Sequence, residues 1–132
     1  MVNIVEISYD IWSNNACHCQ SIGAPTLEEV VDSISRLDAK HYTLATIKLS
    51  SGDEMTVGGG DSGRYVVYIE SSGRFFSLCG DDRSENIYYI NIGGQVGDYN
   101  VAFVVNLPQA LQAATAFYRT GSADQAMQWQ NQ

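Results

Sequence analysis

Basic residues are scarce in this sequence, which has seven Lys and Arg against fifteen Asp and Glu, a net charge of −8. The segment Ser50–Asn100 is itself acidic, because its eight Asp and Glu face only three Arg and leave a net charge of −5. Such a surface repels nucleic acid and anionic lipid, and it attracts basic proteins and speeds their association. The charge therefore argues against direct nucleic-acid or membrane binding, although acidity also serves solubility alone.

Long apolar runs are missing too. No stretch approaches the length that spans a bilayer, and the start of the chain lacks the basic segment of a secretion signal. Glu6 and Asp10 also interrupt what would be the apolar part of such a signal. We therefore expect a cytoplasmic protein. With 132 residues, the chain is long enough for one domain (1–132) with a single core.

Cysteine is limited to three residues, an odd number, and without a secretion signal we expect free thiols. Cys17-His18-Cys19 invites a zinc interpretation. Structural zinc sites, however, pair their ligands in motifs such as C-x-x-C, and the distant His41 and Cys79 stand outside any such motif. The sequence predicts no metal site.

Signatures of catalysis and of cofactor binding are also absent. No nucleophile motif surrounds a cysteine, although a small hydrolase using Cys79 or His41 is a formal alternative. The glycines of 58–63 precede a strand pattern and lack the Lys-Ser/Thr of a phosphate loop. The acidic run Asp81–Glu85 lacks the ligand register of a calcium loop. We predict no catalytic residue, no cofactor and no small-molecule substrate.

The most informative stretch that is present is Glu54–Ile69. Its second half, Tyr65–Ile69, places apolar side chains on both faces, which is typical of a strand inside a sheet. Met55–Val57 is a shorter strand, and the glycines of 58–63 turn the chain between the two. This pattern predicts a hairpin whose second strand is central in the sheet.

Other strands are predicted by β-branched and aromatic residues between short turns, whereas Ser13–Gly23 is polar and is expected to be irregular. These strands are Asn3–Trp12, Tyr42–Leu49, Arg74–Cys79, Asn86–Ile92 and Tyr99–Val105. Two helices follow from capping signals and apolar stripes. The first begins at Thr26, with Glu29 completing a capping box; the second begins at Asn106 and ends at Gly121. The expected fold is α+β, a curved antiparallel sheet of about six strands packed by two helices.

A spaced set of motifs resembles a known family. The motifs occur in this order: Gly52, Met55–Gly60, Tyr65–Tyr68, Gly93-Gly94-Gln95, Leu107-Pro108 opening an alanine-rich helix to Phe117, Gly121 and Trp129. This order resembles the first immunity-protein family of bacterial polymorphic-toxin systems. The resemblance implies a non-enzymatic antitoxin in interbacterial competition that binds one toxin domain, often a deaminase acting on nucleic acid.

The expected contact surface rests on charge and on aromatic residues, because acids meet Arg or Lys and tyrosine offers contact area at low entropic cost. The candidate toxin-binding residues are Asp61, Tyr68, Asp81, Asp82, Glu85, Asp98 and Tyr99. The expected partner is a cognate toxin domain bound 1:1, whose active site the acidic surface blocks. The alternative is a small-ligand-binding or dimerising regulatory α+β module without catalysis.

Overall fold

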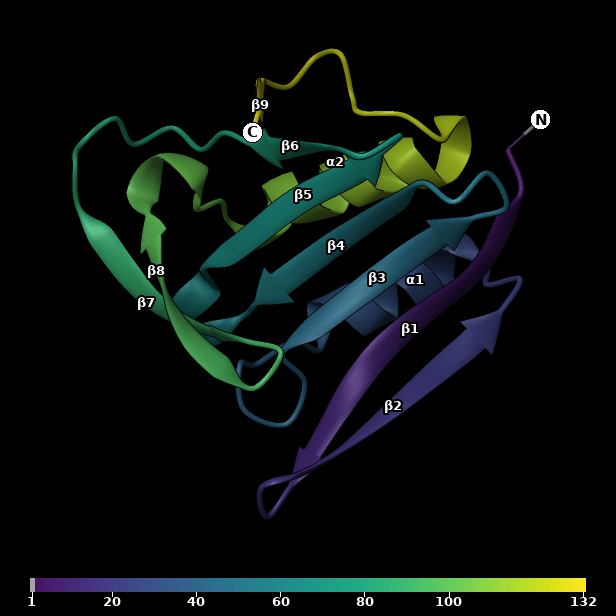
Figure 1. Ribbon diagram of the computed structural model, residues 1–132, viewed down its shortest axis with the longest axis horizontal. Coiled ribbons are helices and arrows are strands. Elements are labelled where there is room, and N and C mark those ends of the chain that lie inside the picture. The colour runs from purple at the N-terminus through teal and green to yellow at the C-terminus, as the bar shows by residue number, and fades with distance from the viewer. Residues whose placement is uncertain (1) are drawn as a thin grey trace.

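Seven strands pair into one antiparallel sheet in the computed structural model, which describes residues 2–132 (Figure 1). Their order across the sheet is β2-β1-β3-β4-β5-β6-β9. The strands are β1 (Ile4–Ser13), β2 (Ala16–Gly23), β3 (Leu44–Leu49), β4 (Glu54–Gly59), β5 (Tyr65–Ser71), β6 (Arg74–Leu78) and β9 (Trp129–Asn131). The sheet is open, and with its helices it makes the predicted single α+β domain.

The predicted hairpin around the glycine turn is confirmed. β4 and β5 pair from Glu54↔Glu70 to Gly59↔Tyr65, and a short 3-10 turn, η1 (Asp61–Gly63), connects them. β5 is flanked on both sides, by β4 and β6, and buries side chains on both of its faces, as its apolar pattern predicts.

Both predicted helices and their caps are confirmed. α1 (Leu27–Ser35) starts with a capping box in which Glu29 N–H donates to Thr26 Oγ1 at 3.1 Å and Thr26 N–H donates to Glu29 Oε1 at 2.9 Å. α2 (Leu107–Thr120) starts with a second box between Asn106 and Gln109. Its C-cap, Gly121, has φ 74°, a left-handed conformation that costs glycine little.

The core lies between the sheet and these helices, which cover the same face (Figure 1). Alternate strand residues such as Ile7, Met55 and Val67 pack against Ile34 and Phe117, and all five side chains are fully buried. The hydrophobic effect on this one face holds the helices to the sheet. In the described part of the chain, residues 2–132, no α-helix covers the opposite face of the sheet.

Two strands were not predicted. Ser13–Gly23, expected to be irregular, instead contains β2, an edge strand whose residues are mostly exposed. Without a buried face it has no apolar alternation to reveal it. Asn14 and Asn15, with φ of 50° and 68°, form its two-residue hairpin turn. At the other edge, β9 has three residues and pairs with β6.

The predicted strand Tyr99–Val105 is wrong in its bounds. β7 (Ile87–Ile92) and β8 (Gln95–Asn100) pair across the two-residue turn Gly93-Gly94, and Val101–Phe103 forms a 3-10 turn, η2. This hairpin is a separate two-stranded sheet and stands at one end of the open face (Figure 1). Within residues 2–132, no helix is long and apolar enough to cross a membrane.

Candidate functional site

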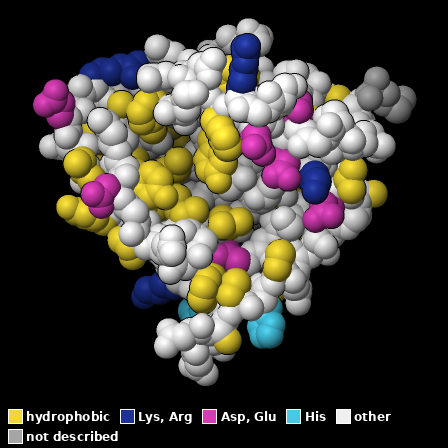
Figure 2. Space-filling model, viewed as in Figure 1, with side chains coloured by type: hydrophobic (Ala, Val, Ile, Leu, Met, Phe, Trp, Pro, Cys, Tyr) yellow, Lys and Arg dark blue, Asp and Glu magenta, His cyan; other side chains and the backbone are white. Residues whose placement is uncertain are grey.

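The face of the sheet opposite the helices is the candidate surface for function (Figure 2). Side chains alternate along a strand, so the residues between the core positions point to this face. Figure 2 views this face and shows a hollow near its centre, with apolar side chains gathered on one side and acidic ones on the other.

A charged row crosses four neighbouring strands on this face. The strand registers place Glu6 opposite Lys48, Lys48 opposite Glu54, and Glu54 opposite Glu70. Lys48 Nζ lies 3.9 Å from Glu54 Oε1. Because neighbouring strands lie about 4.8 Å apart, the row is a closely spaced line of three carboxylates and one ammonium group.

A row of hydroxyl side chains runs beside the charged row. Its members stand opposite one another in six successive strands: Ser21, Ser8, Thr46, Thr56, Tyr68 and Ser77. Thr46 and Thr56 join in a hydrogen bond of 3.0 Å between their Oγ1 atoms. Thr56 is buried, but the other members are at least partly exposed. Hydroxyls both donate and accept, so these exposed members offer a partner hydrogen bonds of either sense.

Three aromatic side chains, Tyr68, Phe75 and Tyr99, gather at the end of these rows. The rings of Tyr68 and Phe75 lie 6.2 Å apart between centroids, tilted by 52°, and Phe75 is 42% exposed. Burial raises the pKa of Tyr99, and the neighbouring Tyr68 phenol raises it further. Tyr99 lies on the inner face of the β7–β8 hairpin, since Tyr89, Val96 and Asp98 on the other face are exposed.

Close packing on glycines holds the β7–β8 hairpin against the open face. A Cβ atom at Gly58 of β4 would lie 2.6 Å from Ile92 Cγ2, so only glycine admits this isoleucine. A Cβ atom at Gly94 would collide with the Trp12 indole. Asn91 Nδ2 donates to the carbonyl oxygen of Ala39 at 2.9 Å. The two strands thus form a wall at one end of the open face.

A buried carboxylate fixes the same wall. The side chain of Asp10 accepts hydrogen bonds from Thr43 N–H at 2.7 Å, Leu44 N–H at 3.0 Å and Trp12 Nε1 at 2.7 Å, and from the Thr43 hydroxyl. The Thr43 hydroxyl oxygen in turn accepts from Gly93 N–H at 2.8 Å. Asp10 therefore ties β1, the start of β3 and the hairpin turn into one network.

The outer face of the hairpin is apolar and exposed. Ile87, Tyr89 and Val96 are 51%, 71% and 69% exposed, and Asp98 stands opposite Tyr89. Exposed apolar groups of this kind are common at sites of protein contact. The hairpin therefore presents an apolar outer surface in addition to the aromatic group that it helps to form inside.

The seven sequence-predicted contact residues do not all lie together. Tyr68 lies on the open face and Tyr99 on the inner face of the hairpin, whereas Asp98 is on the outer face of the hairpin. Asp61 is exposed in η1. The remaining three, Asp81, Asp82 and Glu85, are exposed in the loop that follows β6.

Two of these loop acids are fixed by local hydrogen bonds. Gln109 Nε2 donates to Asp81 Oδ2 at 3.2 Å, and Ser84 N–H donates to Asp82 Oδ1 at 2.8 Å. The bonds from Ser84 lower the pKa of Asp82 and keep it charged.

Sequence reasoning missed the row acids Glu6, Glu54 and Glu70. Each stands alone in the sequence, and only the strand register aligns them. The sequence does show which face of its strand each acid occupies. Each acid is an odd number of residues away from a core position of the same strand, such as Ile7, Met55 or Ile69, and so points to the opposite face.

The cysteine and histidine candidates do not form a site. Cys17 and Cys19 lie on β2 and Cys79 follows β6, with four strands between them. His41 Nδ1 pairs with Asp38 Oδ2 at 3.2 Å. Within residues 2–132, no three side chains of His, Cys, Asp or Glu come together in a way that could hold a metal ion.

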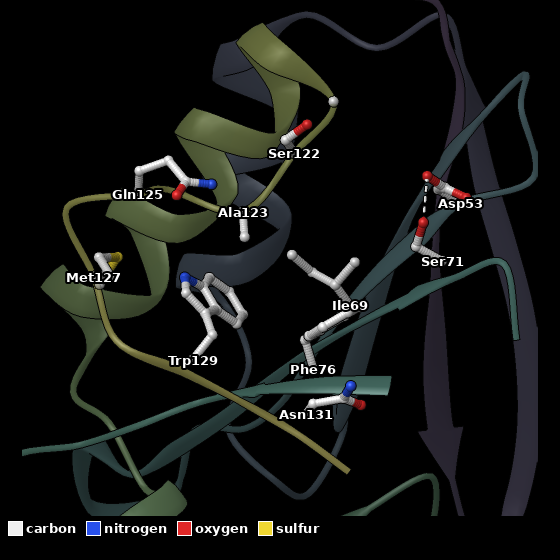
Figure 3. A pocket seen from close by; sticks show the side chains of 11 residues that line it. Asp53, Ile69, Ser71, Phe76, Ser122, Ala123, Gln125, Met127, Trp129 and Asn131 are labelled. Carbon is white, nitrogen blue, oxygen red and sulfur yellow. Dashed lines mark hydrogen bonds between the residues drawn. The ribbon is translucent and has the colours of Figure 1, made fainter. Parts of the chain in front are cut away.

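A cavity of about 530 Å³ lies on the helix side of the sheet (Figure 3). Ile69, Phe76 and the tail residues Met127 and Trp129 line it, and at its rim Ser71 Oγ donates to Asp53 at 2.9 Å. Polar side chains complete the lining: Asp53, Ser71, Ser122, Gln125 and Asn131. The alternative of a small-ligand module would bind its ligand in this cavity.

Comparison with models of known protein families identifies a family for this chain. A family model described as immunity protein Imm1 matches residues 20–131, from within β2 to the end of β9. No curated protein matches the chain. The matched segment contains Lys48, Glu54 and Glu70 of the charged row and all three aromatic residues, and it leaves out Glu6.

Proposed function

The chain belongs to the Imm1 family of immunity proteins, and we propose that it neutralises one cognate interbacterial toxin domain by covering its active site. The family description supports the immunity role, and the toxin's chemistry is our inference from charge. A toxin that acts on nucleic acid, such as a deaminase, binds its substrate in a basic cleft. An acidic protein fits such a cleft in place of the phosphate backbone.

The observation that carries this proposal is the charged row on the open face. Three carboxylates lie in one line on a rigid sheet, so they are held in place before the partner arrives. Together with the hydroxyl row and the aromatic residues, they combine charge, hydrogen bonding and contact area, which is the composition of a protein interface.

The acidic loops serve the same partner in a second way. Asp61, Asp81, Asp82, Glu85 and Asp98 are exposed, so their charges act through solvent and steer a basic protein toward the surface. We assign them to the rim of the contact, where charge changes the association rate more than the lifetime of the complex. Tyr68 and Tyr99 belong to its centre.

Inhibition by occlusion requires no catalysis, metal or cofactor from this chain. A single face binding a single cleft implies a 1:1 complex. A toxin whose substrate is nucleic acid acts in the cytoplasm, and the immunity protein must be present there to protect the cell.

The experiment that tests this proposal is capture of the tagged chain from its native cells, followed by mass spectrometry of the proteins that stay bound. We expect one stoichiometric partner that ends in a small basic domain toxic to cells without the immunity protein. If the chain comes down alone, or with many weakly bound proteins, the immunity proposal is wrong. A ligand in the cavity of Figure 3 would then be the next hypothesis.

A further inference from the structure

The aromatic end of the open face has the features of a subsite for one side chain of the partner. Resting on the proposed function, we infer that Tyr68, Phe75, Tyr99 and Glu70 receive an arginine of the toxin domain. Its guanidinium group packs against the aromatic rings and pairs with the Glu70 carboxylate. The inference assigns a partner residue to the part of the sheet face that lies beside the β7–β8 hairpin and that no α-helix of residues 2–132 covers.

The strand register builds this subsite. Tyr68 and Glu70 are two residues apart on β5, so they point to the same face, and Phe75 of β6 stands directly opposite Glu70. Tyr68 and Phe75 are tilted by 52° rather than stacked on each other. Their ring faces are thus not fully used by one another, and Tyr99 lies on the inner face of the neighbouring hairpin, opposite Tyr88.

The charges of the row indicate that the bound group is a cation. Glu54 and Glu70 stand directly opposite each other, an arrangement that destabilises a sheet. Lys48 Nζ lies 3.9 Å from Glu54 Oε1, but among the described residues no Lys or Arg lies within ion-pair distance of Glu70. A positive group from outside would relieve this repulsion, so the free face is complementary to a cationic partner.

Arginine fits better than lysine for geometric reasons. Its planar guanidinium stacks on aromatic rings and forms two parallel hydrogen bonds with one carboxylate, whereas lysine provides a compact, strongly hydrated charge. The protein uses the same contact internally. The Arg64 guanidinium lies 3.7 Å from the ring centroid of Tyr88, and that of Arg36 lies 4.3 Å from Tyr9 and 4.6 Å from Tyr42.

The first test needs no toxin and uses Nα-acetyl-arginine amide as the probe, with the lysine analogue as its matched control. In NMR titrations of the ¹⁵N-labelled chain, we expect saturable shifts at Tyr68, Glu70, Phe75 and Tyr99 with the arginine probe. With the lysine probe, or in the Glu70→Gln chain, these shifts should fall at least threefold. Equal responses to both probes, or shifts centred on Asp81–Glu85, would overturn the inference.

The second test uses the toxin domain recovered from native cells, in a catalytically inactive form. Glu70→Gln and Tyr68→Ala should each weaken its binding at least tenfold. Asp32→Asn removes an exposed acid from α1, on the other side of the sheet, and should stay within twofold of the unmodified chain. If the unmodified chain binds the toxin tightly and neither face variant weakens binding, the arginine subsite is wrong while the immunity function stands.

Discussion

Glu54 and Glu70 face each other across neighbouring strands on the uncovered side of the sheet. Natural sheets rarely retain a like-charged pair of this kind without a use, because the repulsion lowers stability. Here the pair belongs to a row in which only Lys48 carries positive charge. The protein therefore keeps an unfavourable arrangement on the face that we assign to partner binding.

Removing one charge of this pair should stabilise the isolated chain. We expect Glu70→Gln to raise the free energy of unfolding by about 0.2–1 kcal/mol at pH 7 and low salt, because it ends the repulsion with Glu54. The gain should shrink as salt screens the two charges. Urea unfolding measures it, with Asp32→Asn as the control. A loss of stability in Glu70→Gln would show that Glu70 has a favourable partner within the fold.

The contact between Gly94 and Trp12 makes a second prediction. Gly94→Ala should be destabilised by about 1–3 kcal/mol more than Gly73→Ala, because an added methyl group collides with the indole. Gly73 is a matched control, since its φ of 78° is close to the 83° of Gly94 and its surroundings are open. Thermal unfolding of both variants gives the comparison, and equal losses would contradict the packing of the hairpin on β1.

Asp38 makes stability depend on pH in the acid range. Burial alone would raise the pKa of Asp38, but hydrogen bonds from Tyr42, Lys40 and His41 lower it from the usual 3.8 to about 2. The folded state thus favours the carboxylate. Its contribution is fully present above pH 4 and is lost as the pH falls from about 4 to about 2.

Asp38→Asn should therefore flatten the fall in stability between pH 4 and pH 2. The side chain is 43% exposed, so solvent screening will keep the effect modest. Chemical denaturation of both proteins at several pH values measures it. Two curves that run parallel through this range would show that the carboxylate has an ordinary pKa in the folded chain.

The loop acids should control how fast the complex forms. We expect the double variant Asp81→Lys and Asp82→Lys to weaken binding and to slow association with the toxin domain about tenfold at low salt, with much of the difference lost at high salt. Stopped-flow or surface-plasmon kinetics would measure this. Unchanged binding at low salt would remove the loop from the contact surface.

The sequence predicted those parts of the fold that local chemistry determines. The capping box at Thr26, the N-cap at Asn106 and the hairpin before Tyr65 each depend only on neighbouring residues, and all three are confirmed. β2 and β9 were not predicted because both are exposed edge strands. Pairing with a neighbouring strand, and not an apolar sequence pattern, makes each of them a strand.

The candidate site was less accessible from sequence. Tyr68 and Tyr99 were predicted as contact residues; Tyr68 lies on the open face of the sheet and Tyr99 on the inner face of the hairpin. The row acids Glu54 and Glu70, by contrast, are sixteen positions apart in the sequence and adjacent only through strand register. A single sequence shows which face of its strand a residue occupies, but it does not give the register between strands. The register is what places these acids next to one another.

The most direct test of the central claim is a growth assay in cells that express the cognate toxin domain together with variants of this chain. Two double variants change the net charge equally: Glu54→Gln with Glu70→Gln on the open face, and Glu28→Gln with Asp32→Asn on α1. We expect the unmodified chain and the α1 variant to restore growth and the open-face variant to fail, although it is folded. Full protection by the open-face variant would contradict the claim that this face neutralises the toxin.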